Sequence, residues 1–231
     1  MPGQPMAAIS CHTSRLKHSS SSASRRARSW ATPAFAAIQQ PDCYPDAPGG
    51  LWCFVLVEND SGDPVENVSG AVTLRYGEET RSQTAILPLN LLPDGAALPL
   101  ITYFQAPIPA DYTVSARVDF FLPVMPDDQR YLPVTIEDQT LELSMDGRVA
   151  EVSGLLTLPA GQPAARYAWV NATAYDADGR VVAVRRGDSP EALSGGVRLP
   201  FTLYLYSLGG AIDRVDLLAE AQPEIVPTEE D

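Results

Sequence analysis

The chain has few residues whose types and spacings support catalysis. Its two histidines, His12 and His18, both lie in a basic, serine-rich N-terminal stretch, so the rest of the chain has neither a Ser-His-Asp nor a Cys-His arrangement. Neighbouring carboxylates occur in expected turns and in the C-terminal tail, where acidic residues are common: Asp127/Asp128, Asp176/Asp178 and Glu229/Glu230. We therefore expect a protein that is not an enzyme and that has no catalytic residues, no metal ligands and no cofactor.

The three cysteines are Cys11, Cys43 and Cys53. Cys43 and Cys53 flank a turn rich in proline and glycine, residues 44–50, which can bring two strands within reach of a disulfide. If the protein is exported, we expect a Cys43–Cys53 bridge. The alternative is two free thiols, with Cys53 serving as a small apolar core residue. A zinc site is not expected, because one pair of cysteines lacks two further ligands.

Aromatic residues are the better indication of function. Trp169 and Tyr175 share one face of an expected strand, and small residues occupy the opposite face. If the small residues face the core, the two rings are exposed and can stack on sugars or pack against a partner. The alternatives are the reverse orientation, or an aromatic face covered by another domain. Tyr204 and Tyr206 leave the same choice open, so all four form a candidate partner surface.

Charge is divided unequally along the chain. Residues 1–40 contain five basic residues and no acidic one. Residues 41–231 contain the other 11 basic residues and all 29 acidic ones, a net charge of −18. A body this acidic repels phosphate backbones, so we expect no nucleic-acid partner. The N-terminal stretch is expected to be disordered, and residues 29–38 are too short and polar for an ordinary export signal. No run of 18 apolar residues occurs, so no membrane-spanning segment is expected.

The strongest pattern of secondary structure lies in Tyr167–Val184. Two stretches rich in β-branched and aromatic residues flank an Asp-Ala-Asp-Gly turn at residues 176–179, which is typical of a β-hairpin. Similar stretches, separated by Gly, Pro and Asp turns, occur at residues 51–57, 68–76, 80–87, 98–104, 112–121, 134–136, 141–143, 148–158, 197–206 and 212–219. The pattern predicts an all-β protein.

The two halves repeat one another. Pro64 matches Pro163, Val72 matches Val170, and Leu98-Pro99 matches Leu199-Pro200, at offsets of 98 to 101 residues. Short strands at this spacing favour a β-sandwich in each half. The predicted organisation is a disordered basic tail at 1–33, a sandwich at 34–122, a linker at 123–130, a second sandwich at 131–222 and an acidic tail at 223–231.

Two motifs resemble the FxLYD-type domain. The first half contains Asn-Asp-Ser-Gly-Asp-Pro-Val-Glu-Asn-Val at residues 59–68, and the second contains Ala-Tyr-Asp-Ala-Asp-Gly-Arg-Val-Val at 174–182, followed by Leu-Pro-Phe at 199–201. The first half departs from the pattern, with Tyr-Gly-Glu-Glu at 76–79 where the family has a Tyr-Asp-x-x-Gly turn. The resemblance implies tandem immunoglobulin-like or fibronectin-III-like sandwiches of bacterial envelope proteins, without catalytic residues.

From these observations we expect a non-enzymatic interaction or spacer module, outside the cytoplasm. Its partner is then a protein or another component of the cell envelope. The alternative is a carbohydrate-binding module that holds a polysaccharide with its exposed aromatic residues.

Overall fold

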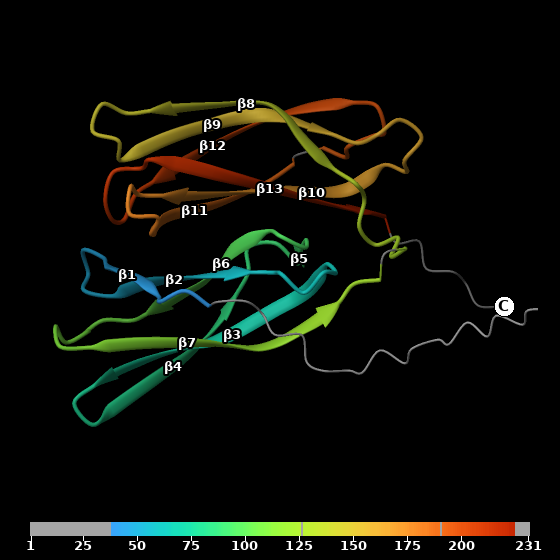
Figure 1. The fold of residues 1–231 in the computed structure, drawn as a ribbon. Helices are drawn as coiled ribbons and strands as arrows, with labels where there is room; N and C mark the ends of the chain where they lie inside the picture. The colour runs from blue at the N-terminus through green and yellow to red at the C-terminus, as the bar shows by residue number, and fades with distance from the viewer. Residues whose placement is uncertain (1–37, 126, 190, 225–231) are drawn as a thin grey trace, which may run out of the picture. The chain divides into compact units, whose positions relative to one another are not determined.

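The computed structural model describes residues 38–125, 127–189 and 191–224 (Figure 1). These residues form strands joined by turns and contain no helix, so none of them lies in a helix able to cross a membrane. The prediction of an all-β protein with two sandwich-like bodies is confirmed. The expected basic tail and most of the expected acidic tail lie outside the described residues.

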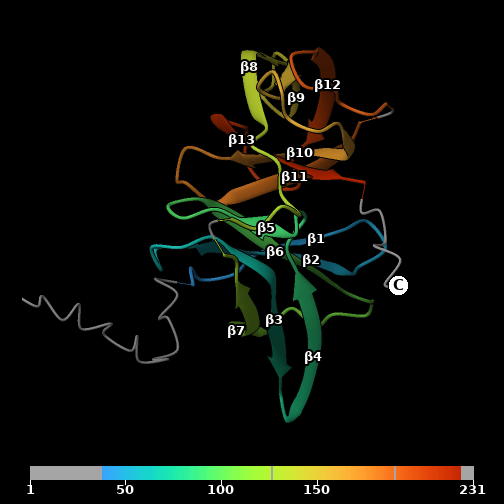
Figure 2. The same ribbon diagram turned by 90° about the vertical axis from the view of Figure 1, so that its right-hand side faces the viewer.

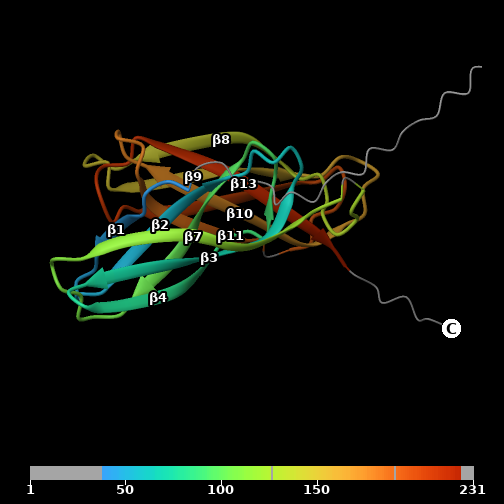
Figure 3. The same ribbon diagram turned by 60° about the horizontal axis from the view of Figure 1, so that its bottom comes forward.

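The first body, here called the first sandwich, contains the strands β1 (Asp42–Pro45), β2 (Leu51–Glu58), β3 (Val65–Tyr76), β4 (Glu79–Ile86), β5 (Leu91–Leu92), β6 (Ala97–Phe104) and β7 (Thr113–Pro123). Their order is β1-β2-β6-β4-β3-β5, with β7 on the other side of β3. One residue pair, Ile86 and Ile101, joins β4 to β6. At this point the sheet turns over, so that β1, β2 and β6 lie in one layer and β3, β4 and β7 in the other (Figures 1 and 3).

The core of the first sandwich lies between these layers. Alternate residues of β2, among them Cys53, Val55 and Val57, meet Val72 and Leu74 of β3 in one buried cluster. The side chains of a strand point to opposite faces in turn, so β2 presents Trp52, Phe54 and Leu56 on its other face. Phe54 and Leu56 are also buried, so this strand is covered on both faces.

The second body, here called the second sandwich, contains β8 (Thr135–Leu143), β9 (Val149–Thr157), β10 (Ala165–Tyr175), β11 (Val181–Asp188), β12 (Arg198–Tyr206) and β13 (Arg214–Pro223). One sheet has the order β11-β10-β13 and the other β12-β9-β8, as Figure 2 shows. The central strand β9 alternates strictly between half-buried and buried residues. Its inward residues, with those of β10 and β12, form the second core.

Four strand pairs of the first sandwich recur in the second. The pairs β1–β2, β2–β6, β3–β4 and β3–β7 of the first correspond to β8–β9, β9–β12, β10–β11 and β10–β13 of the second. The repeated Leu-Pro dipeptides occupy matching places, because Pro99 lies opposite Leu56 of β2 and Pro200 lies opposite Leu155 of β9. The halves therefore share these four strand pairs, although the first sandwich also has the β4–β6 and β3–β5 pairs.

The β10–β11 hairpin forms as its turn residues predict. Asp176 accepts hydrogen bonds from the backbone N–H groups of Asp178 and Arg180, each at 3.0 Å. Gly179 has a φ of 80°, which glycine adopts without steric cost. The turn joins β10 to β11 in the register that buries Ala174 and Ala183 opposite each other.

The segment between the sandwiches is held by both. Val124 is buried and donates its N–H to Pro64 of the first sandwich (2.8 Å). Leu132 belongs to the second core and donates its N–H to Ala221 (2.9 Å). One of these backbone contacts lies near the start of the predicted linker, and the other lies just after its end at residue 130. Strand β13 extends to Pro223, one residue into the predicted tail.

Candidate binding site at the junction of the two sandwiches

A groove of about 410 Å³ lies where the outer face of β2 and β6 meets the strands β11 and β12. Most of its lining is aromatic or aliphatic: Trp52, Phe54, Ile101, Ala183, Val184, Tyr204, Leu205, Tyr206 and Leu208, with Arg185 as the one basic residue. The first three residues come from the first sandwich and the others from the second. Neither sandwich alone supplies both walls.

The first wall is positioned by the alternation of β2. Cys53 points into the first core, so its neighbour Trp52 points outward and is 37% exposed. The Trp52 ring packs against Tyr103 of β6, with 4.9 Å between ring centroids. The Tyr103 hydroxyl donates a hydrogen bond to Asp46 in the β1–β2 loop (2.8 Å). This bond fixes the tyrosine, and through it the indole, in place.

The second wall includes β12, where Leu203 and Leu205 enter the second core and the alternate residues Tyr204 and Tyr206 face outward. Tyr204 is 49% exposed and Tyr206 is 65% exposed. The negative charge of Glu151, opposite Tyr204 on β9, raises the pKa of the Tyr204 hydroxyl. Two of the four aromatic residues predicted as a partner surface therefore lie together in the groove.

Tyr175 corrects the prediction of an exposed aromatic face on β10, because its side chain is only 1% exposed. It forms a buried cluster with Phe54, Leu56 and Val181, which joins the two sandwiches below the groove. Burial raises the pKa of its hydroxyl to about 12, and the Arg214 guanidinium lies 3.7 Å from its ring centroid. Tyr175 therefore cannot contact an external partner.

Trp169 is half-buried and does not line the groove. It packs against the core of the first sandwich, stacks on Tyr167 at 5.7 Å, and carries the Arg186 guanidinium over its ring at 5.6 Å. The small residues Ala172 and Ala174 are fully buried on the other face of β10. The alternative in which the first domain covers the aromatic face is the arrangement that the structure has.

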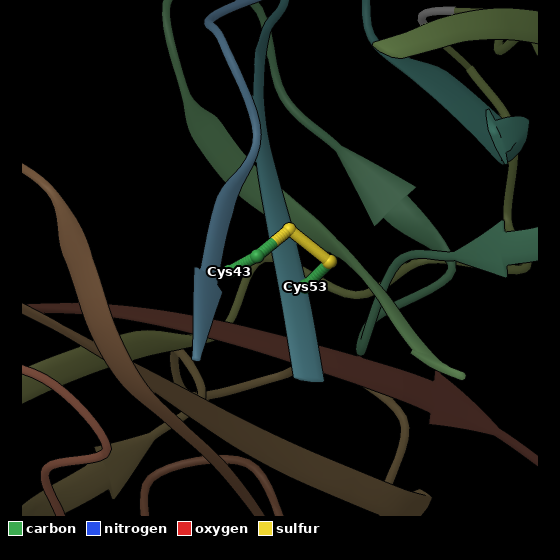
Figure 4. The surroundings of a disulfide bond; sticks show 2 residues. All are labelled: Cys43 and Cys53. Carbon is green, nitrogen blue, oxygen red and sulfur yellow. A yellow bond between two sulfur atoms is a disulfide. The ribbon is translucent and has the colours of Figure 1, made fainter. Parts of the chain in front are cut away.

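The disulfide lies next to the groove. Cys43 of β1 and Cys53 of β2 are opposite each other in register, with 4.1 Å between their Cα atoms, and are joined by a bond between their sulfurs (Figure 4). Cys53 is fully buried in the first core, and Cys43 packs against that core. The bridge thus points away from the groove, while Tyr44 and Trp52, the next pair along, point toward the second sandwich.

Two acidic residues are buried at the junction as well. Glu220 of β13 is 3% exposed and accepts hydrogen bonds from the backbone N–H groups of Asn90 (2.7 Å) and Leu91 (2.9 Å) in the first sandwich. Burial raises the pKa of Glu220 even though these donors oppose the shift. Glu66 of β3 accepts from the Tyr131 hydroxyl (2.5 Å) and from Arg130 (2.8 Å).

Neither acid could be recognised as a junction residue from its sequence context, because each is an isolated acidic residue within a strand. Each oxygen of both carboxylates accepts at least one hydrogen bond from the protein itself. The hydrogen bonds of Glu220 link the two sandwiches, and those of Glu66 link the first sandwich to the connecting segment. Within residues 38–125, 127–189 and 191–224, no three His, Cys, Asp or Glu side chains are grouped to hold a metal ion.

Comparisons with known proteins add little to this geometry. The chain matches no protein-family profile and no curated protein. Among solved structures it is similar to red sea bream transglutaminase, with 12% sequence identity and a TM-score of 0.22. The match covers 79% of this chain and 29% of that chain, so it spans less than a third of the larger protein.

Proposed function

We propose that the protein is a non-enzymatic interaction module that works outside the cytoplasm and binds a partner in the groove between its sandwiches. The observation that carries this proposal is the gathering of exposed rings, Trp52, Tyr204 and Tyr206, around an apolar floor. Exposed apolar surface of this kind marks interaction sites, and tryptophan and tyrosine dominate binding energy in protein interfaces. The groove is lined by aromatic rings, aliphatic groups and one guanidinium, a set of groups that suits ligand binding better than catalysis.

The location outside the cytoplasm is supported by the Cys43–Cys53 disulfide. Disulfides persist in oxidising compartments and are rare in the cytosol. The resemblance to tandem FxLYD-type envelope domains supports the same location. The Tyr-Asp-x-x-Gly turn on which this resemblance depends, residues 175–179, joins β10 to β11 in the second sandwich.

A protein segment suits the groove better than a sugar does. Aliphatic side chains such as Ile101, Val184 and Leu208 supply much of the lining, whereas a sugar needs several polar groups to meet its hydroxyls. The carbohydrate-binding alternative is favoured by one specific feature, the exposed rings of Tyr204 and Tyr206 beside the Trp52–Tyr103 pair, because such rings stack on sugar faces.

The test is selection of ligands against the whole protein. Peptides displayed on phage and a panel of soluble polysaccharides are tested for binding to the native protein, then to a Tyr204→Ala/Tyr206→Ala variant and to Trp52→Ala. Loss of a central aromatic residue is expected to cost about 2 kcal/mol or more, a loss of roughly thirtyfold in affinity. Titration calorimetry with each selected ligand measures this loss.

The matched control is Phe120→Ala. Phe120 is an exposed aromatic residue of β7 that does not line the groove, so its removal should leave binding unchanged. Peptides that lose affinity only in the groove variants support the proposal, and polysaccharides that do so support the alternative. Ligands that bind all four proteins equally well contradict both.

A further inference from the structure

Strand β1 contacts both sandwiches with opposite faces. Cys43 faces the first core, where it is bonded to Cys53, and the residues on either side of it face the second sandwich. Asp42 accepts a hydrogen bond from the backbone N–H of Val181, 2.9 Å away and 139 residues later in the chain. One short strand thus links the two bodies.

Tyr44 makes the second of these contacts. Its ring packs beside the Phe54, Leu56, Tyr175 and Val181 cluster and also contacts the second core. It lies so close to Gly209 that a Cβ atom at that glycine would be 2.4 Å from the ring. Because Gly209 has no side chain, it leaves the space that the Tyr44 ring occupies.

The disulfide is the strongest attachment of β1 to its own sandwich. The strand has four residues, lies at the edge of the sheet and pairs with β2 alone. A pair of strands this short is marginal without further support. The bridge closes a loop between residues 10 apart in sequence and holds the strand against the core from within.

The same strand determines the position of the first groove wall. In the β1–β2 register, Tyr44 lies opposite Trp52 and Asp42 lies opposite Phe54, so the residues that contact the second sandwich are paired with residues that line the groove. The loop after β1 is also tied to this wall, because Asp46 accepts the hydrogen bond from Tyr103, the residue that packs against Trp52.

We infer that β1 is a strap that locks the first sandwich onto the second beside the groove, and that the Cys43–Cys53 disulfide keeps the strap in place. Without the bridge, β1 leaves β2, Asp42 and Tyr44 leave the second sandwich, and the two walls of the groove lose their fixed spacing. The consequence for binding rests on the proposed function, whereas the docking of the strap does not.

Amide hydrogen exchange tests the docking directly in the full chain. In the native protein the Val181 amide is protected by Asp42. In a Cys43→Ala/Cys53→Ala variant this protection is expected to fall roughly tenfold or more, the effect of losing a hydrogen bond to a charged group. The Asn90 and Leu91 amides, which Glu220 holds, should keep their protection and serve as the internal control.

Two further variants keep the test decisive. Asp42→Ala removes the acceptor and leaves the bridge and the core intact, so it shows how much protection the Val181 amide loses when its hydrogen bond is absent. Asp42→Asn, which retains an acceptor oxygen, is its control. Cys43→Ala/Cys53→Val restores core volume without a bridge, in case the double alanine variant does not fold. If Val181 stays protected in a folded variant without the bridge while Asp42→Ala loses protection, the strap does not depend on the disulfide and the inference is overturned.

Binding then separates this inference from the proposed function. For a peptide selected on the groove, Asp42→Ala and the variants without the bridge should bind more weakly than the native protein. If exchange behaves as expected but the Tyr204→Ala/Tyr206→Ala variant binds as well as the native protein, the strap stands and the proposed groove function fails.

Discussion

At the residue scale, Glu220 shows how burial and hydrogen bonding compete. The carboxylate has lost almost all of its water, which favours the protonated form, while the two backbone donors and Gln222 favour the charged form. Burial is the larger effect, so the pKa lies above its ordinary value of 4.5. Arg186 is the charged group that opposes the shift, and the nearby Tyr131 has its own pKa raised, chiefly by burial and also by the charges of Glu66 and Glu220.

This shift predicts a pH-dependent effect of Glu220→Gln. A carboxyl whose pKa is raised on folding binds its proton more tightly in the folded state, so its contribution is greatest below pH 4.5 and is lost as pH rises through the interval above that value. Glutamine keeps an acceptor for both backbone donors without the charge. The variant should therefore match the native protein near pH 4 and exceed its stability at pH 7, as measured by urea denaturation.

Glu220→Ala is the contrasting variant. It leaves the Asn90 and Leu91 N–H groups buried without their acceptor, which costs about 1–3 kcal/mol for each group left unpaired. It should be less stable than the native protein at both pH values. A glutamine variant that follows the alanine variant instead would show that the charge itself, and not an acceptor, holds this end of the junction.

At the element scale, alternation of apolar and polar residues identified nearly every strand. It located β2, β6 and β9 within one residue of their observed ends, and it located the β10–β11 hairpin, although β11 continues to Asp188, beyond the predicted end at Val184. It gave no sign of β1 or β5, because strands of four and two residues are too short to show a period. The two expected segments at 134–136 and 141–143 are one strand, β8.

The candidate site was harder to predict for a physical reason. Alternation reports which face of a strand meets its own core, and it does not report what covers the opposite face. Tyr175 and Tyr206 look alike in sequence, yet the first is covered by the first sandwich and the second is open. Trp52 had a usable signal, since a strand apolar on both faces must have its outer face covered by something.

The docking of β1 makes a specific prediction about two neighbouring glycines. A methyl group at Gly209 would overlap the Tyr44 ring, whereas one at Gly210 would lie 3.4 Å from the nearest atom of Asp176, close to ordinary contact. Gly209→Ala should therefore destabilise the protein by about 1–3 kcal/mol through overpacking, and Gly210→Ala by less. Thermal unfolding of both variants measures the difference.

A double-mutant cycle shows whether Tyr44 is the cause. Adding Tyr44→Ala removes the ring that the new methyl group strikes, so Gly209→Ala should cost much less in that background than in the native one. Equal costs in the two backgrounds would place the strain elsewhere in the 207–212 loop.

At the scale of the whole molecule, the groove exists because two separately folded cores share a boundary. Its walls belong to different sandwiches, and one lining residue, Phe54, belongs to the buried cluster of Phe54, Leu56, Tyr175 and Val181. Two polar contacts flank this cluster, the Asp42–Val181 bond and the hydrogen bonds of Glu220 to Asn90 and Leu91. The apolar contacts supply attraction, and the polar contacts fix one relative position, because hydrogen bonds are directional and the hydrophobic effect is not.

Such a boundary predicts that the native protein unfolds as one cooperative unit. It also predicts that, when both polar contacts are removed, the two sandwiches unfold separately. In an Asp42→Ala/Glu220→Ala variant the sandwiches keep their own cores but lose the bonds that register them, so scanning calorimetry should resolve two transitions in place of one. The calorimetric enthalpy of this variant should exceed its van't Hoff enthalpy, whereas the two values should agree for the native protein and for Asp42→Asn/Glu220→Gln, which retains acceptors at both places. A single transition in the alanine variant would mean that the apolar cluster alone couples the sandwiches, and the polar contacts would then set the spacing of the groove walls without setting cooperativity.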